Sequence, residues 1–237
     1  DTTLRDGTQR EGLSLSADDK VKIARELDQL GIHYIEGGWP GSNPKDAEFF
    51  QKIQHVELKN AKVAAFGSTR HAKTTCADDP NIRALIEANT PVVTLVGKSS
   101  VLHVEKVLET TLNENLHMIG DSVAYFCAMG KEVIYDAEHF FDGYKLDAEY
   151  AIETITAAAR AGAHCLTLCD TNGGSLPAEI AQAVKVVREH LRAEGLDPQI
   201  GIHTHNDGAL AVANAMAAVD AGCVQVQGTI NGYGERC

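Results

Sequence analysis

The stretch from Ala161 to Gly174 reads Ala-Gly-Ala-His-Cys-Leu-Thr-Leu-Cys-Asp-Thr-Asn-Gly-Gly, and its pattern decides the fold. An expected helix over Asp147 to Ala161 ends at Gly162, because glycine readily adopts the left-handed conformation that closes a helix. The apolar run from His164 to Leu168 is typical of a buried strand, and a polar loop follows it from Asp170. The stretch therefore contains one complete helix-to-strand connection.

The same connection recurs along the chain. We expect further helices over Ala17 to Leu30, Ser175 to Ala193 and Asp207 to Ala221, each ending near a glycine. The expected strands cover Asp1 to Leu4, Ile32 to Glu36, Lys62 to Phe66, Val92 to Val96, Glu132 to Tyr135, His164 to Leu168, Ile200 to His205 and Val224 to Ile230. Strands that alternate with helices in this number are typical of a barrel of about 250 residues. The sequence therefore predicts an α/β fold, a (β/α)8 TIM barrel in which this chain ends after the eighth strand.

An open, doubly wound sheet is the alternative arrangement of the same elements. No Gly-x-Gly-x-x-Gly follows the first expected strand, which disfavours the dinucleotide-binding form of that fold. No Pro-rich linker, charge block or low-complexity segment divides the chain, so we expect one domain over residues 1–237. Because the chain starts at Asp1 without Met and stops abruptly at Cys237, we expect it to be part of a longer polypeptide.

Charge and composition exclude several classes of function. The 237 residues include 21 basic and 33 acidic side chains, a formal charge of −12, which argues against sequence-independent nucleic-acid binding. No apolar run approaches the roughly 18 residues that a membrane helix needs. The six cysteines include no Cys-x-x-Cys pair, so we expect reduced thiols in a cytoplasmic protein rather than a disulfide framework or a zinc knuckle.

The strongest signal for chemistry is Ile200-Gly-Ile-His203-Thr-His205-Asn-Asp207. Alternate side chains of a strand point to the same face, so His203 and His205 project together from the end of the seventh expected strand. Barrel enzymes place their active-site groups at this end of their strands. Two imidazoles there suit a divalent metal, and the alternative is a pair of hydrogen-bonded polar histidines.

A third metal ligand is available near the start of the chain. Asp6 ends the first expected strand, which in a closed barrel lies close to the seventh, so Asp6 can converge on both histidines. The alternative for Asp6 is an Asx-turn before Gly7. Arg5 favours the functional interpretation, since an arginine at a strand end inside a barrel needs an anion to neutralise it.

Several loop residues are further candidates. Glu36 ends the second expected strand, before a Gly/Pro-rich loop with the single Trp39 that can wrap a ligand or form a structural turn. Glu138, after the fifth expected strand, is a candidate acid or a solvated carboxylate, and the loop from Asp170 can simply cap the next helix. The glycines of Asn231-Gly-Tyr-Gly-Glu-Arg-Cys237 could bring the backbone close to a ligand.

These motifs carry a resemblance to a known family. Leu4-Arg-Asp-Gly-Thr-Gln9, with Lys20 in the first helix, and His203-Thr-His-Asn-Asp207 resemble the two signatures of the α-isopropylmalate, homocitrate and citramalate synthases among the DRE-TIM metallolyases. The segments Glu36 to Asp46 and Gln227 to Cys237 look most like those of citramalate synthases. The chain departs from the family at Gly208-Ala209, where Leu-Gly is common, and it ends before the asparagine that approaches the metal in the family and before the downstream subdomain.

The resemblance implies a metal-assisted Claisen condensation of acetyl-CoA with a 2-keto acid, followed by thioester hydrolysis. It assigns one divalent metal (zinc, magnesium or manganese) to Asp6, His203 and His205. Arg5 would stabilise the charge that develops on the keto oxygen, and Glu36 would orient Arg5. Gln9 and Thr171 would bind the substrate, and Glu138 would help to enolise acetyl-CoA. The resemblance also implies a homodimer whose partners are small molecules.

Several assignments stay open within and outside this family. We expect pyruvate as the keto acid and citramalate as the product, in branched-chain amino-acid biosynthesis, with 2-isopropylmalate or homocitrate synthase as the alternative. A lyase of the HMG-CoA-lyase type is a further alternative, although Gly222-Cys223 matches the Gly-Cys loop of such lyases only superficially. An iron oxygenase built on His205-Asn-Asp207 and a non-catalytic scaffold are less favoured, the first because of the strand–helix alternation.

Overall fold

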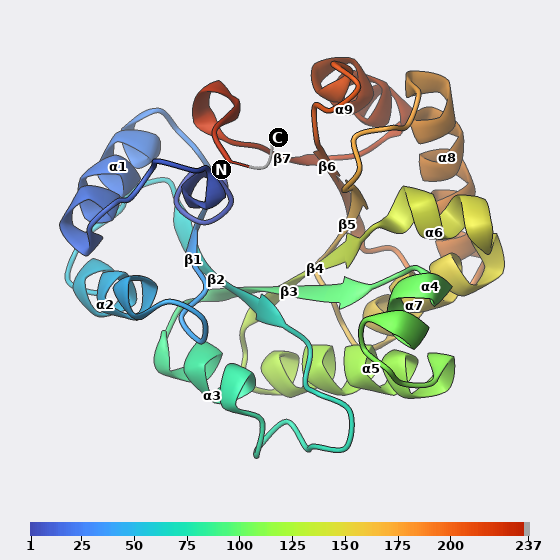
Figure 1. Ribbon diagram of the computed structural model, residues 1–237, viewed down its shortest axis with the longest axis horizontal. Coiled ribbons are helices and arrows are strands. Elements are labelled where there is room, and N and C mark those ends of the chain that lie inside the picture. Colours follow the sequence, from blue (N-terminus) through green and yellow to red (C-terminus); the bar gives the residue numbers. More distant parts are fainter. Residues whose placement is uncertain (235–237) are drawn as a thin grey trace.

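The computed structural model describes residues 1–234 and forms one curved parallel sheet covered by helices (Figure 1). The described strands are β1 (Tyr34–Gly38), β2 (Lys62–Ser68), β3 (Val92–Lys98), β4 (Glu132–Glu138), β5 (Cys165–Asp170), β6 (Gln199–Thr204) and β7 (Gln225–Gln227). Their order in the sheet is the order in the sequence, and each neighbouring pair is parallel. A doubly wound sheet would reverse its strand order at one point, so this order excludes that alternative.

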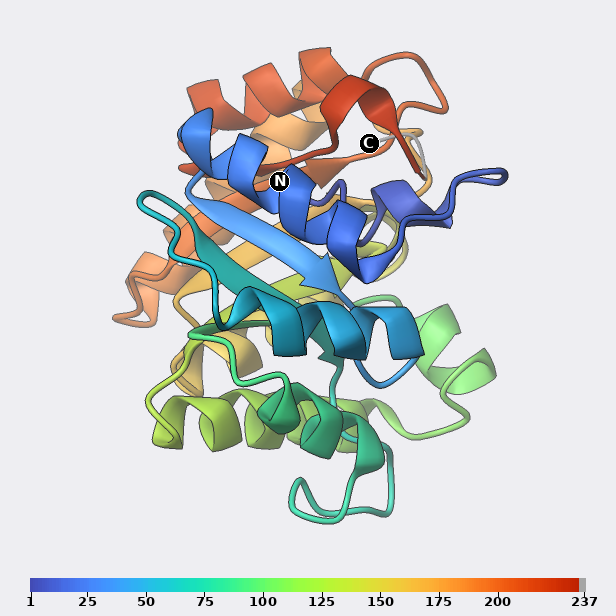
Figure 2. The same ribbon diagram turned by 90° about the vertical axis from the view of Figure 1, so that its left-hand side faces the viewer.

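The helices lie outside the curved sheet, as the side view shows (Figure 2). They are α1 (Ala17–Gln29), α2 (Pro44–Ile53), α3 (Pro80–Glu87), α4 (Val101–Lys106), α5 (Leu112–Ala128), α6 (Phe140–Leu146), α7 (Ala148–Arg160), α8 (Pro177–Ala193) and α9 (Ala211–Ala221), with short 3-10 helices at Gly7–Gln9 and Ile230–Gly232. Within residues 1–234, none of the helices has the length and apolar character that crossing a membrane requires. The five cysteines in this part of the chain are free thiols, and Cys237 lies outside it.

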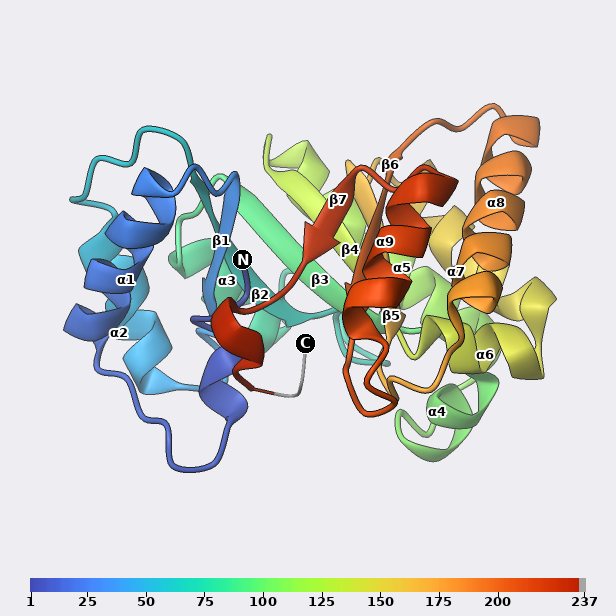
Figure 3. The same cartoon turned by 90° about the horizontal axis from the view of Figure 1, so that it is seen from above.

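The first expected strand, Asp1 to Leu4, is wrong. The chain turns from Thr3 onward, because Arg5 and Gly7 both donate their N–H groups to the carbonyl of Thr2, and only Asp1 and Thr2 come before this turn. These two residues nevertheless join the edges of the sheet. The carbonyl of Asp1 accepts from the N–H of Glu36 at 2.9 Å, and the N–H of Thr2 donates to the carbonyl of Gly228 at 2.9 Å. The N-terminus therefore lies between β1 and β7 (Figure 3).

Other expected boundaries differ from the structure by a few residues. Strand β7 is only Gln225–Gln227, because the chain turns into a 3-10 helix at Ile230 instead of continuing to pair. Helix α8 starts at Pro177, whose fixed φ suits the first helical turn, rather than at Ser175. Helix α9 starts at Ala211 rather than at Asp207, since Thr204 and Asn206 hold the intervening loop through hydrogen bonds to Ala211.

Strand alternation sorts the side chains between two environments. Residues such as Val93, Leu95 and Leu166 face outward and pack against the helices in the large hydrophobic core. The intervening residues face the barrel interior, where a small apolar cluster of Ala64, Val92, Ile134 and Cys165 sits among polar side chains. The apolar core between sheet and helices therefore stabilises the fold, and the interior is left for polar groups at the strand ends.

The buried Lys20 connects α1 to the turn after the N-terminus and to the end of β1. Its Nζ donates to the carbonyls of Leu4 at 2.6 Å and Gly37 at 3.1 Å, and it forms an ion pair with Asp46. The second carboxylate oxygen of Asp46 accepts from the N–H of Trp39. Lys20 thus links the turn that carries Arg5 to the end of β1.

We expect Lys20→Met to lower the free energy of unfolding by about 3–5 kcal/mol, because it leaves the buried Asp46 carboxylate without its partner. Urea denaturation monitored by circular dichroism measures this change. Lys22→Met is the matched control, since the Lys22 side chain is 77% exposed on the same helix and its loss should stay within about 0.5 kcal/mol. Equal stability of the two variants would show that the buried pair contributes nothing.

Candidate metal centre

A cavity of ≈ 610 Å³ opens at the carboxyl ends of the strands. It is lined by most of the residues that the sequence singled out, namely Arg5, Asp6, Gln9, Trp39, Glu138, Thr171, His203 and His205. Glu36 does not line this cavity but lies behind Arg5 and is buried. The structure therefore brings the residues of the two sequence motifs, which lie at opposite ends of the chain, into one site.

Asp6, His203 and His205 form a compact cluster of possible metal ligands. One donor atom from each side chain lies within 4.8 Å of the others, and all three residues are buried. The Nε2 atoms of His203 and His205 are 3.1 Å apart, and His203 Nε2 is 3.7 Å from Asp6 Oδ2. Within residues 1–234, these three side chains are the one group of histidine, cysteine or acidic residues whose donor atoms lie close enough together to bind a metal ion.

The tautomers of both histidines follow from the partners of their Nδ1 atoms, which are the ring nitrogens that face away from the cluster. His203 Nδ1 lies 2.9 Å from Gln227 Oε1, and His205 Nδ1 lies 2.7 Å from the carbonyl oxygen of Thr171. Because carbonyl oxygens only accept, each neutral ring carries its proton on Nδ1 and a lone pair on Nε2. Burial lowers the pKa of His203, which the nearby Asp6 carboxylate only partly opposes, so the neutral ring is favoured.

This donor set fits a divalent cation. Two imidazole lone pairs facing each other at 3.1 Å beside a carboxylate repel one another unless a cation lies among them. Histidine nitrogen and aspartate oxygen are ordinary ligands of zinc. Three protein ligands also leave coordination positions open for a substrate. Asp6 makes no side-chain cap to the following 3-10 helix, so its interpretation as an Asx-turn is not supported.

Arg5 is held on three sides beside this cluster. Its Nε donates to Glu36 Oε1 at 2.6 Å, its terminal nitrogen lies 3.3 Å from Asp6 Oδ1, and its guanidinium lies 4.0 Å from the ring centroid of Phe66. Although burial alone lowers the pKa of Arg5, the charges of Glu36 and Asp6 raise it above its ordinary value. Arg5 therefore presents a permanent, oriented positive charge to the cavity.

Arg5 and Asp6 do not end a strand, as the sequence suggested, but lie in a helical turn. A close backbone approach supports this turn from the other end of the chain. A Cβ on Gly234, whose φ is +94°, would lie 2.1 Å from the carbonyl oxygen of Asp6. Gly234 thus brings the backbone close to Asp6, a candidate to bind the metal, rather than to a bound small molecule as the sequence suggested. Glu235, Arg236 and Cys237 of the same motif lie outside the described residues.

Glu138 and Thr171 approach the cavity from neighbouring strands. Glu138 ends β4 and forms an ion pair with Lys98 at the end of β3. The Thr171 hydroxyl accepts from the N–H of His139 at 2.9 Å, which leaves its own proton available to an acceptor in the cavity. The Thr171 carbonyl also holds His205. One residue thus connects a metal-ligand candidate to the opening of the cavity.

Two other candidates have structural roles. Asp170 accepts from the N–H and the hydroxyl of Ser175 and so organises the start of α8, as its alternative interpretation predicts. Trp39 donates its indole N–H to Asn81 at 2.8 Å and contacts Phe66 edge to face, which fixes it as one wall of the cavity. Gly222 ends α9 with φ +108°, so the Gly222-Cys223 pair is a helix stop.

Sequence reasoning missed Asp136 and the role of Gln227. Asp136 lines the cavity two residues before Glu138, and burial, reinforced by the charge of Glu36, raises its pKa to about 7. Its carboxylate accepts from Gln227, which in turn holds His203. The period-two rule that paired the histidines also places Asp136 and Glu138 on one face, and this signal was available in the sequence.

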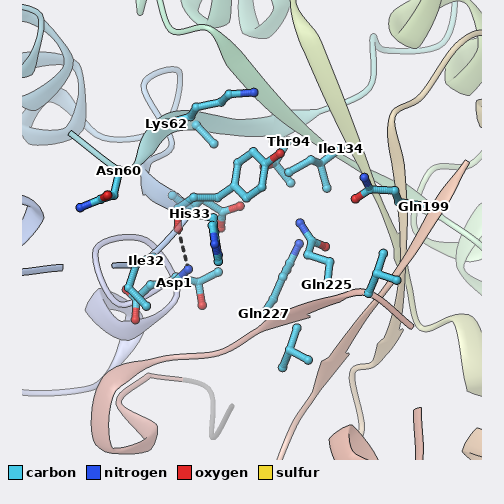
Figure 4. Close-up of a pocket in the computed structure, with 16 residues that line it drawn as sticks. Asp1, Ile32, His33, Asn60, Lys62, Thr94, Ile134, Gln199, Gln225 and Gln227 are labelled. Carbon is cyan, nitrogen blue, oxygen red and sulfur yellow. Dashed lines mark hydrogen bonds between the residues drawn. The ribbon is translucent and has the colours of Figure 1, made fainter. Parts of the chain in front are cut away.

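A second cavity of ≈ 470 Å³ lies toward the amino ends of the strands (Figure 4). It includes Asp1, His33, Lys62 and Gln199, and it opens where only Asp1 and Thr2 bridge β1 to the segment after β7. Gln225 and Gln227 extend into it from the same side of β7. The amino ends of barrel strands serve stability rather than catalysis, and this cavity contains no cluster of metal-ligating side chains within the described chain.

A model of the HMGL-like family matches residues 1–237. The chain belongs to the HMGL-like family. Among curated relatives, the (R)-citramalate synthases of Geobacter sulfurreducens and Aquifex aeolicus are each 56% identical to it, over 237 and 236 residues respectively. The 2-isopropylmalate synthase of Staphylococcus carnosus is 33% identical over 236 residues. These alignments cover 100% of this chain but only 44% of each relative.

Comparison with solved structures confirms the predicted fold class. The HMG-CoA lyase of Bacillus subtilis superposes with a TM-score of 0.79 at 22% identity, covering 100% of this chain and 77% of the lyase. An HMG-CoA lyase from Acinetobacter baumannii, in complex with coenzyme A and 3-methylmalate, gives the same TM-score and identity and is covered to 75%. At this level of identity the likeness establishes the barrel fold and nothing about substrate.

Proposed function

We propose that the full-length protein condenses acetyl-CoA with pyruvate and hydrolyses the thioester to give citramalate. In this proposal residues 1–237 supply the catalytic barrel. The observation that carries it is the convergence of Asp6, His203 and His205 beside Arg5 in a chain 56% identical to named (R)-citramalate synthases. The lower identity to 2-isopropylmalate synthase, 33%, favours pyruvate over the longer keto acid.

Asp6, His203 and His205 would hold one zinc, magnesium or manganese ion, which when bound supplies Lewis-acid polarisation of a keto group. Arg5 lies within reach of the same place, and its guanidinium would stabilise negative charge that develops on the keto oxygen. Glu36 keeps the guanidinium in one orientation through the 2.6 Å bond to its Nε. The charge of Arg5 is thus set in place before the reaction, so no reorganisation is needed when charge develops.

Thr171 and Gln9 are the proposed contacts to the carboxylate of the keto acid. Thr171 has its hydroxyl proton directed away from His139, whose N–H it accepts, and it lines the cavity. Gln9 lies one turn beyond Asp6 at the end of the 3-10 helix and offers amide donors at the same opening. Both residues donate hydrogen bonds that an anionic substrate can accept.

Glu138 is the proposed acid–base group for acetyl-CoA. It lines the cavity on the side of β4, where an acyl group could lie between it and Arg5. Lys98 at the end of β3 pairs with its carboxyl group and so holds it at this side of the cavity. We further propose a cytoplasmic homodimer with small-molecule partners only.

A thiol-release assay tests the proposed substrate. Full-length protein is given acetyl-CoA with pyruvate, 2-oxoisovalerate or 2-oxoglutarate, and kcat/KM is measured for each. We expect pyruvate to exceed 2-oxoisovalerate by at least about 10- to 200-fold, since one methylene in an apolar pocket is worth about 1–3 kcal/mol and 2-oxoisovalerate carries two more carbons than pyruvate. We expect 2-oxoglutarate to be rejected more strongly, because its second carboxylate would enter a cavity in which Lys98 and Arg70 are already ion-paired.

Other outcomes of this assay overturn specific parts of the proposal. A preference for 2-oxoisovalerate or 2-oxoglutarate would make the protein a 2-isopropylmalate or a homocitrate synthase, with the same site residues. Absence of thiol release, together with cleavage of a 3-hydroxyacyl-CoA, would make it a lyase. Oxygen consumption with iron and 2-oxoglutarate would make the protein an oxygenase, and the proposed condensation with acetyl-CoA would be wrong for every keto acid.

A further inference from the structure

Three buried polar side chains form a hydrogen-bonded chain across the barrel interior. His203 Nδ1 lies 2.9 Å from Gln227 Oε1, and Gln227 Nε2 donates to Asp136 Oδ1 at 2.9 Å. The three residues are buried and come from β6, β7 and β4. Asp136 is thereby connected to a metal-ligand candidate, His203, on a strand two places away in the sheet.

The direction of the Gln227 carboxamide is fixed by its neighbours. Asp136 Oδ1 accepts from Gln227 Nε2, so the amide nitrogen lies on that side. The Thr167 hydroxyl donates to Gln225 Oε1 at 3.0 Å, and its oxygen accepts from Gln227 Nε2 at 3.2 Å. Two acceptors therefore hold the nitrogen side of the amide, and the oxygen side faces His203.

The two histidines differ in how their remote nitrogens are held. His205 Nδ1 faces a backbone carbonyl, that of Thr171, which cannot exchange donor for acceptor. His203 Nδ1 faces a side-chain amide, which can turn by 180° and present its NH2 group instead. A turned amide would accept no proton from Nδ1 and would favour the tautomer with its proton on Nε2, directed at Asp6 and His205. A second residue is therefore needed to keep the Gln227 amide oxygen directed at His203 Nδ1.

We propose that Asp136 and Gln227 are positioning residues that hold His203 in its metal-binding tautomer. Asp136 fixes the amide of Gln227, the amide oxygen accepts the proton of His203 Nδ1, and Nε2 keeps its lone pair toward the cation site. The proposal rests on the metal site of the proposed function. It adds a role for two residues that are not among the proposed metal ligands. Outer partners of metal-ligating histidines typically change metal affinity by about 10–100-fold when they are lost.

The test compares Asp136→Leu with Asp136→Asn in the full-length protein. The leucine side chain offers no acceptor, whereas the amide oxygen of the asparagine can still accept from Gln227 Nε2. The ring-nitrogen chemical shifts of ¹⁵N-labelled histidine report the tautomer of His203 without metal. Calorimetric titration with Mn²⁺ alone reports the affinity. We expect Asp136→Leu to mix the tautomers and weaken Mn²⁺ binding by about 10–100-fold, and Asp136→Asn to keep both close to the unaltered chain.

A double variant, Asp136→Asn with Gln227→Glu, reverses the polarity of the chain of bonds. The carboxylate introduced at position 227 accepts from His203 Nδ1 and from the amide nitrogen introduced at position 136. We expect Mn²⁺ affinity at or above that of the unaltered chain, because a carboxylate on the remote nitrogen makes imidazole a stronger ligand. This variant keeps the test decisive if Asp136→Leu does not fold.

Distinct results would overturn the two proposals. If the unaltered protein binds Mn²⁺ and Asp136→Leu leaves both tautomer and affinity unchanged, the positioning role is wrong while the metal site stands. The positioning role is also wrong if the double variant folds but loses Mn²⁺ affinity and its His203 carries the proton on Nε2. If the unaltered protein binds no divalent cation, the metal site fails, and the purpose assigned to Asp136 and Gln227 fails with it.

Discussion

His203→Ala is expected to abolish tight binding of the divalent cation. The change removes one of three donors that lie within 4.8 Å of one another, and it leaves His205 and Asp6 as the protein ligands. Loss of a partner outside the ligands costs about 10–100-fold in affinity, so loss of a direct ligand should cost more. Metal analysis of the purified protein and calorimetric titration measure the change, and Asp6→Asn and His205→Ala should behave alike.

The matched control for this prediction is His33→Ala. His33 is an exposed histidine at the amino end of β1, in the cavity at the opposite end of the barrel from the metal-ligand candidates. The control removes the same side chain without touching the cluster, so metal content should stay at that of the unaltered protein. Full occupancy in all three ligand variants would reject the assignment of Asp6, His203 and His205.

The sequence predicted the fold class because each strand–helix connection carries its own local signals. Gly162 and Gly222 end helices with positive φ, as their position before an apolar run indicates. The strand over Asp1 to Leu4 lacked such support. It contains one apolar residue, and its direction is decided by bonds from Arg5 and Gly7 to Thr2 that no local pattern reveals. Edges of a barrel depend on closure, which is a property of the whole chain.

The candidate site was predictable where two residues of one strand act together. His203 on β6 and His205 directly after it project to the same side, as strand alternation predicts, and their Nε2 atoms lie 3.1 Å apart. Asp136 and Gln227 meet from different strands, and only the curvature of the whole sheet decides that contact. A single acid or amide in an expected strand gives no sign of such a partner. Contacts between residues on distant strands could therefore not be predicted from the sequence.

Arg5→Lys is expected to lower kcat by about 100- to 1,000-fold, the usual cost of losing one preorganised donor at a developing oxyanion. Lysine keeps the positive charge but has a single ammonium in place of the planar guanidinium. In the structure Arg5 uses Nε for Glu36 and another nitrogen for Asp6, and its plane lies over Phe66. An ammonium cannot satisfy Glu36 and still extend a donor into the cavity.

The measurement pairs steady-state kinetics with metal analysis, because Arg5 also contacts Asp6. Metal content close to that of the unaltered protein, together with the loss in kcat, places the effect on the developing charge rather than on cation binding. Arg70→Lys serves as the control, since Arg70 lines the same cavity but is paired with Glu114 and Asp121 away from the metal cluster. If Arg5→Lys retained near-normal turnover, Arg5 would be a structural ion-pair partner of Glu36, and the charge on the keto oxygen would have to be stabilised by the other groups at the cation site.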